Sequence, residues 1–190
     1  MCQPDVGANL MFALELITLS FLCTMGEHKV RPYTLKPMYN FSMNPYPEFR
    51  FYKCPDCQNK TGQRKLPLII HIDPKNLIAL NYTCRYCHQC DMLIAKKHEI
   101  EHHLTEIFQI MDKDVIGNNY IVFGTVEKKA WRENIHHPKS FDEMRQNIHD
   151  FISYQTIQMR MAGWFQKGMT PPVMKTPPST EWVKQLTSIG

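Results

Sequence analysis

The chain has 190 residues, 43% of them hydrophobic and 21% charged, and a formal net charge of +4. This composition is ordinary for a soluble globular protein, and the mild charge permits contact with nucleic acid or an acidic partner without favouring either. Seven cysteines, five of them within one window of fewer than forty residues, argue against a disulfide scaffold. They favour metal binding in a reducing compartment, so we predict a cytoplasmic protein.

Residues 1–45 are predicted to form an N-terminal extension that is apolar at first and then irregular. Its long apolar run, residues 9–25, has no Lys or Arg before it, as a signal peptide would require, and Glu15 interrupts it. The run is also shorter than the roughly 20 apolar residues that a spanning helix needs. We therefore expect no membrane association.

Residues 46–137 are predicted to form a zinc-binding α+β domain. Two cysteine clusters, 52–57 and 82–90, flank two apolar segments, 66–72 and 77–83, which are separated by the turn sequence Asp73-Pro74-Lys75-Asn76. This pattern predicts a β-hairpin that brings the two clusters together.

The clusters have the spacing of a tetrathiolate zinc site, because a two-residue spacer lets one turn aim both sulfurs of a pair at a single ion. Five cysteines are candidates for the four ligands of one Zn²⁺: Cys54, Cys57, Cys84, Cys87 and Cys90. In the second cluster Cys84 and Cys87 repeat the Tyr-x-Cys-x-x-Cys frame of the first. Cys87 and Cys90, however, place a turn residue, Asp91, just before the next strand. The residues leave the choice between Cys84 and Cys90 open.

Beyond the cysteines we predict a strand over 91–95, a helix over 97–111, a buried strand over 120–126 and a short helical turn over 127–132. Ser140 and Glu143 form a capping box, which predicts a helix to about Tyr154 within a C-terminal helical segment, 138–167. The proline-rich residues 168–190 should be an extended tail, with Trp164 and Trp182 packing back onto the domain.

Cys54-Pro55-Asp56-Cys57, a hairpin and a second C-x-x-C pair resemble a zinc ribbon. The stretch from Tyr52 to Ala95 is also similar to uncharacterised bacterial proteins with CPxC and CRYCxxCD elements. The resemblance implies one structural zinc and a small zinc-ribbon-like β core, here with two or three helices and extended termini in the α+β class. His88 or Asp91 stands where glycine usually follows the second cysteine of a ribbon, which leaves a treble-clef arrangement open.

Three sharper interpretations compete with a structural zinc. His98, Glu99 and His102 match H-E-x-x-H, but helical spacing places both histidines opposite the apolar face. Cys54 and Cys57 could form a thiol–disulfide site, but loop sequence follows them where a helix would stabilise the thiolate. An iron–sulfur cluster would accept the same thiols.

We therefore predict a structural-zinc protein that acts as a binding or adaptor module, with an unknown protein or nucleic acid as partner. Aromatic residues interleave with basic ones around the clusters, a mixture that can stack bases or cover a small zinc core: Phe49, Arg50, Phe51, Tyr52, Lys53, Tyr82, Arg85 and Tyr86. The alternative is a metalloenzyme or thiol-redox protein that uses the C-x-x-C pairs or the helix carrying His98 and His102.

Overall fold

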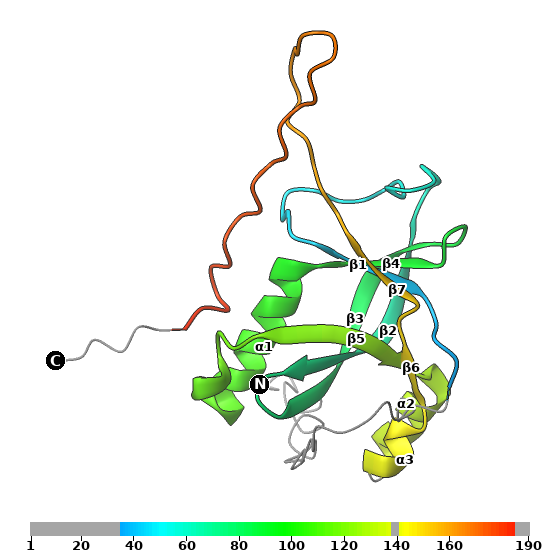
Figure 1. Cartoon of the computed structure of the whole chain (residues 1–190). Helices are drawn as coiled ribbons and strands as arrows, with labels where there is room; N and C mark the ends of the chain where they lie inside the picture. Colours follow the sequence, from blue (N-terminus) through cyan, green and yellow to red (C-terminus); the bar gives the residue numbers. More distant parts are fainter. Residues whose placement is uncertain (1–34, 138–140, 185–190) are drawn as a thin grey trace, which may run out of the picture.

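The computed structural model describes residues 35–137 and 141–184 and has the predicted α+β class (Figure 1). Within these residues a seven-stranded mixed sheet is accompanied by three α-helices and one 3-10 turn. The elements in chain order are β1 (Asn40–Asn44), β2 (Gly62–Ile72), β3 (Asn76–Cys87), β4 (Met92–Lys96), α1 (Lys97–Met111), η1 (Lys113–Val115), β5 (Tyr120–Val126), α2 (Lys128–His136), α3 (Phe141–Arg145), β6 (Ile148–Asp150) and β7 (Ser153–Thr156).

The predicted hairpin is confirmed and lies at the centre of the sheet. β2 and β3 pair antiparallel from Gly62 opposite Tyr86 to Ile72 opposite Asn76. The middle of β2, Leu66–Ile70, is buried at every position, as expected for a strand that is covered on both faces. Because the hairpin is this long, it reaches from the core to the cysteine clusters at its far end.

The sheet curls until its two edges come together. Its strand order is β6-β5-β2-β3-β4-β1-β7, so the edge strands β6 and β7 are consecutive in the chain and only Phe151 and Ile152 connect them. Such a short link is possible only if the sheet bends round on itself. The link is held there by hydrogen bonds from the Phe151 amide to the Phe123 carbonyl and from the Ile152 amide to the Tyr39 carbonyl.

Helix α1 has the predicted bounds and packs its apolar face on the main core. Ile100, Leu104 and Phe108 are buried, whereas Met111 at the end of the helix is 36% exposed. The main core combines this face with residues from the curled sheet, including Leu68, Ile70, Ile72, Leu93 and Val122. Stability therefore does not depend on the cysteine clusters alone, and the sheet is much larger than the predicted ribbon core.

The sheet contains strands from three of the segments that we predicted to be separate. β1 comes from the predicted N-terminal extension, and β6 and β7 come from the predicted C-terminal helix. The helix prediction is wrong beyond Arg145, where two short strands replace it. Ile148 and Phe151 are buried with a spacing that suits a helix, but this segment instead completes both open edges of the sheet. Ser140 and residues 1–34 lie outside the described residues.

Of the two tryptophans that we expected to pack back onto the domain, one does so and the other does not. Trp182 is 6% exposed, donates its indole N–H to the Asn118 carbonyl at 2.7 Å and meets the rings of Phe108 and Tyr120 edge-on. Trp164 is 102% exposed, so our expectation that it packs back is wrong. Among the described residues, no helix combines the length and the apolar character needed to cross a lipid bilayer.

Candidate metal centre

The structure brings Cys54, Cys57, Cys87 and Cys90 together, with their sulfur atoms all within 4.8 Å of one another. The Cys54 and Cys90 sulfurs are 3.9 Å apart, and the Cys57 and Cys87 sulfurs are 3.4 Å apart. A tetrahedron with metal–sulfur bonds of about 2.3 Å has edges of about 3.8 Å, which is close to both values. These four thiols are therefore positioned to hold one metal ion.

Each pair belongs to a tight turn that ends in a left-handed residue. Gln58 follows Cys57 with φ of 60°, and Asp91 follows Cys90 with φ of 46°. This conformation lets the chain leave the turn without displacing the second sulfur, and glycine or aspartate adopts it at the least cost. Asp91 after Cys90 thus repeats, in the second turn, the left-handed conformation of Gln58 after Cys57.

Cys84 does not join the four. It lies on β3 opposite Arg64 and is fully buried in the main core. Burial raises the pKa of its thiol, so it remains protonated and acts as a small apolar side chain. Because side chains alternate along a strand, the odd spacing between Cys84 and Cys87 puts them on opposite faces of β3.

Backbone N–H groups point at the sulfurs of the first turn. The amides of Asp56 and Cys57 donate to the Cys54 sulfur, and the amide of Asn59 donates to the Cys57 sulfur. Hydrogen bonds, above all the one from the Asn59 amide, lower the pKa of Cys57 to about 7, whereas burial raises the pKa of Cys54. A bound cation would favour all four thiolates strongly, because the charge of the ion dominates such a site.

A second hydrophobic cluster, separate from the main core, surrounds the centre. We call it the metal-end cluster. It contains Tyr46, Cys54, Cys87, Met92, Ile94 and Ile157, with Phe51, Cys57, Cys90, Met159 and Met174 against them. Its members come from four stretches of chain, residues 46–57, 87–94, 157–159 and 174, of which the last two follow β7. The sequence offered no signal that Ile157, Met159 and Met174 would pack around the cysteines.

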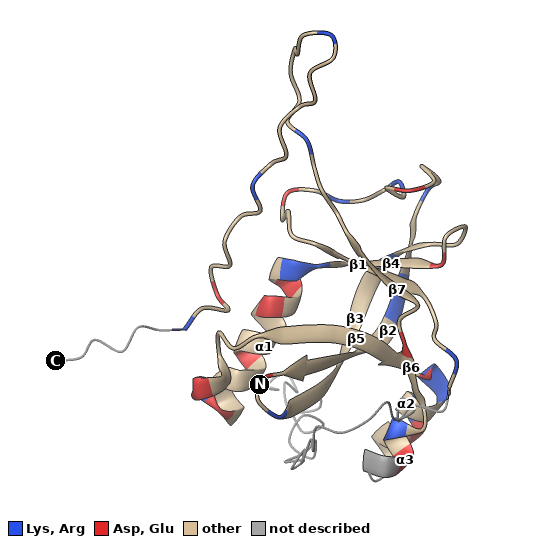
Figure 2. Ribbon diagram, in the orientation of Figure 1, with Lys and Arg blue, Asp and Glu red and all other residues tan. Residues whose placement is uncertain are grey.

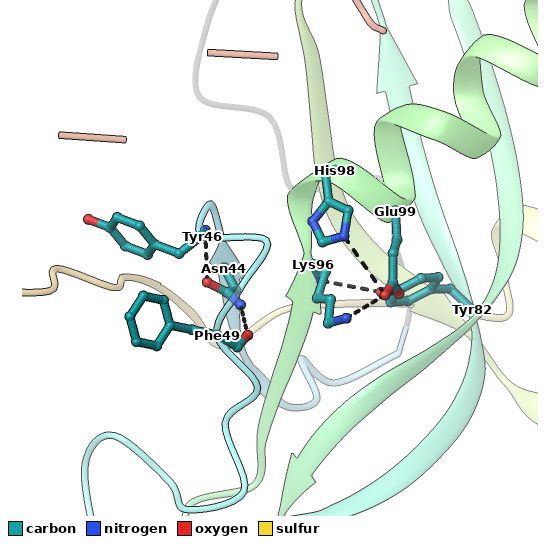
Figure 3. Close-up of polar contacts among 7 residues, drawn as sticks. All are labelled: Asn44, Tyr46, Phe49, Tyr82, Lys96, His98 and Glu99. Carbon is teal, nitrogen blue, oxygen red and sulfur yellow. Dashed lines mark hydrogen bonds and ion pairs between the residues drawn. The ribbon is translucent and has the colours of Figure 1, made fainter. Parts of the chain in front are cut away.

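The loop after β1 places Tyr46 in the metal-end cluster (Figure 3). The side chain of Asn44 accepts from the Tyr46 amide at 3.0 Å and donates to the Phe49 carbonyl at 2.8 Å, which fixes the turn between them. The Tyr46 hydroxyl in turn donates to the Met174 carbonyl at 3.2 Å. One buried asparagine thus fixes the direction in which the chain approaches the first cysteine turn.

Side chains from neighbouring strands hold both turns in place. The Arg85 guanidinium donates to the carbonyls of Phe51 (3.2 Å) and Thr61 (3.0 Å) and to the Thr61 hydroxyl, and it lies over the Tyr52 ring. Across the site, the Asn40 side-chain amide donates to the Cys90 carbonyl at 2.8 Å. Arg85 therefore joins both ends of the first loop to β3, and Asn40 joins the second turn to β1.

The H-E-x-x-H segment has a different role from the one the motif suggests (Figure 3). The Glu99 carboxylate accepts hydrogen bonds from the Tyr82 hydroxyl and the Lys96 ammonium, both at 2.6 Å. Burial raises the pKa of Glu99, but these hydrogen bonds outweigh it and lower the pKa below its ordinary value. A carboxylate engaged in this way anchors the first turn of α1 to β3 and is a poor base for activating water.

The two histidines of the motif face away from the core, as predicted. The side chains of His98 and His102 are 42% and 51% exposed. His102 contacts Glu106 and Glu181. Both histidines and Glu181 line a cleft of about 470 Å³ between the start of α1 and the tail. In the part of the chain that the structure describes, the only group of three or more metal-ligating side chains is the set of four cysteines.

The predicted aromatic and basic residues divide between core and surface. Tyr82 and Tyr86 are buried, whereas Tyr52 and Phe49 are exposed beside the first turn, as are Arg50 and Lys53. The buried tyrosines therefore cover the core, and the exposed residues remain available to a partner. Comparison of the chain with protein-family models, with curated proteins and with solved structures found no match in any of the three.

Proposed function

We propose that this chain is a binding module whose metal-end cluster is held together by one structural Zn²⁺ on Cys54, Cys57, Cys87 and Cys90. The observation that carries the proposal is the closed set of four thiols, two of them fully buried. Tetrathiolate sites typically hold zinc for structure, because four protein ligands leave no position for water or substrate. The paired turns on a hairpin also support the zinc-ribbon resemblance, although the surrounding sheet is larger.

The enzyme alternatives draw less support from the geometry. A thiol–disulfide site needs one exposed nucleophile with a free partner, but here Cys54 and Cys57 each lie beside a cysteine of the second turn. An iron–sulfur cluster uses the same number of thiolates, and the metal itself distinguishes it from zinc. For this reason the first experiment is a metal analysis.

The test is the metal content of purified protein, followed by hydrogen exchange before and after chelation. We expect one zinc per chain and no visible absorption band. Because the main core contains none of the four ligands, chelation should remove protection from residues 50–61, 87–92 and 157–175. Protection in the middle of β2, β3 and β5 should remain.

Two results would contradict the proposal. A protein that contains no metal when purified under reducing conditions, or one with the visible absorption of an iron–sulfur cluster, would remove the zinc. Chelation that left exchange unchanged in the metal-end cluster would show that any bound metal is not structural.

A further inference from the structure

An extended arm, residues 158–175, leaves the sheet after β7 and returns beside itself (Figure 1). The two sides of the arm are joined by a bridge between Arg160 and Val173 and by hydrogen bonds from the Met161 amide to the Pro172 carbonyl and from the Met174 amide to the Met159 carbonyl. A turn, Gln166–Met169, closes the tip, with Gly168 at φ of 95°. The arm is thus a defined hairpin-like projection.

The arm exposes large apolar side chains. Trp164 is fully exposed, and Met161 and Met169 are more than half exposed. Phe165, next to Trp164, is half-buried. An exposed tryptophan on a projecting hairpin costs free energy in water, and such residues dominate binding where they occur at interfaces.

The charge of the arm has one sign. Between residues 157 and 180 the chain contains Arg160, Lys167 and Lys175 and neither Asp nor Glu. Figure 2 shows these cations spaced along both sides of the arm and at its tip, with no acidic residue between them. At its base, Met159 and Met174 pack into the metal-end cluster, beside the loop that carries exposed Arg50, Tyr52 and Lys53.

We propose that the arm and the adjoining first cysteine loop bind single-stranded nucleic acid. Trp164, Phe165 and Tyr52 would stack on bases, and Arg160, Lys167, Lys175 and Lys53 would contact phosphates. Stacking platforms within a cationic track are the elements with which proteins hold unpaired strands. This inference rests on the proposed function, because the metal-end cluster holds the arm and the loop beside each other.

A lipid surface fits the same residues less well. A membrane-inserting hairpin leads with apolar residues and keeps its cations behind them. Here the turn at the tip contains Lys167 and Gly168, and Trp164 lies on one side of the arm. Insertion from the tip would carry a lysine into the bilayer first, whereas a strand lying along the arm would meet both its rings and its cations.

The test is fluorescence anisotropy of labelled oligonucleotides of about 15 nucleotides, in DNA and RNA forms, with the zinc-loaded full chain. We expect Trp164→Ala to weaken binding by about 5- to 150-fold, the effect of losing one stacked base. Lys167→Gln should reduce the slope of log K against log salt by about 0.7. Ile110→Ala and Lys128→Gln, which change exposed residues elsewhere, should bind like the wild type.

Each outcome has a distinct meaning. The inference is supported if the protein binds single-stranded DNA or RNA more tightly than a duplex and if the Trp164 and Lys167 variants bind the strand more weakly. Wild-type affinity in both arm variants, equal affinity for a duplex, or binding only to anionic vesicles overturns it. If the protein contains one zinc but binds no strand, the inference fails and the proposed function stands. If no zinc is found, the proposed function itself fails.

Discussion

Replacing Cys84 and Cys90 separately by alanine tests the assignment of the metal ligands. If four thiolates share the roughly 10–16 kcal/mol of a structural zinc site about equally, Cys90→Ala should cost about 2.5–4 kcal/mol of binding. That loss corresponds to roughly 10²- to 10³-fold weaker zinc affinity. Cys84→Ala should leave the affinity unchanged, because Cys84 lies in the main core and its sulfur is not among the four.

Competition with a chromophoric zinc chelator measures both affinities, and thermal unfolding provides the control for folding. Cys84→Ala removes a fully buried sulfur and should lower the free energy of unfolding by about 1 kcal/mol. Cys90→Ala should keep the far-ultraviolet spectrum of the sheet. If Cys84→Ala lost zinc and Cys90→Ala retained it, the ligand set and the pairing of the turns would both be wrong.

Three further predictions follow from individual contacts. Arg85→Ala should weaken zinc binding by about 10- to 100-fold, because the hydrogen bonds of Arg85 to Phe51 and Thr61 hold the first loop. An equal loss is expected in Arg85→Lys. Unchanged zinc affinity of Arg85→Ala in the chelator assay would contradict this role. Trp182→Ala should lower the free energy of unfolding in denaturant by about 3–5 kcal/mol, whereas exposed Trp164→Ala should change it by less than about 0.5 kcal/mol; equal effects would show that the tail is not docked. Glu181 raises the pKa of His102, with Glu106 acting in the same direction, so their contact contributes fully below the unfolded value of about 6.5 and is lost as the pH rises through the higher folded value. Trp182 fluorescence in a Trp131→Phe, Trp164→Phe background should report this release of the tail, and the response should shrink in Glu181→Gln; a response unchanged by that substitution would exclude this ion pair as its origin.

The sequence by itself determined the local features of this protein. Two-residue spacers predicted the cysteine turns, alternation and β-branching predicted the β2–β3 hairpin, and apolar spacing predicted α1 at its observed bounds. The same spacing placed His98 and His102 on the exposed side of α1. These properties depend on neighbours within a few residues of one another, which is the range over which a sequence pattern carries physical information.

Only the tertiary structure decided what lies far apart in the chain. Cys84 and Cys90 are chemically equal in the sequence. In the structure Cys84 lies on β3 with its side chain in the main core, whereas Cys90 lies in the turn after β3 and joins the other three ligands. Residues 148–156 suit a helix locally, yet two open sheet edges make them strands, because backbone groups at an edge gain partners that no local pattern records. Long-range contacts likewise set the positions of β1, through the hydrogen bond of Asn40 to Cys90, and of the base of the arm, through Met159 and Met174.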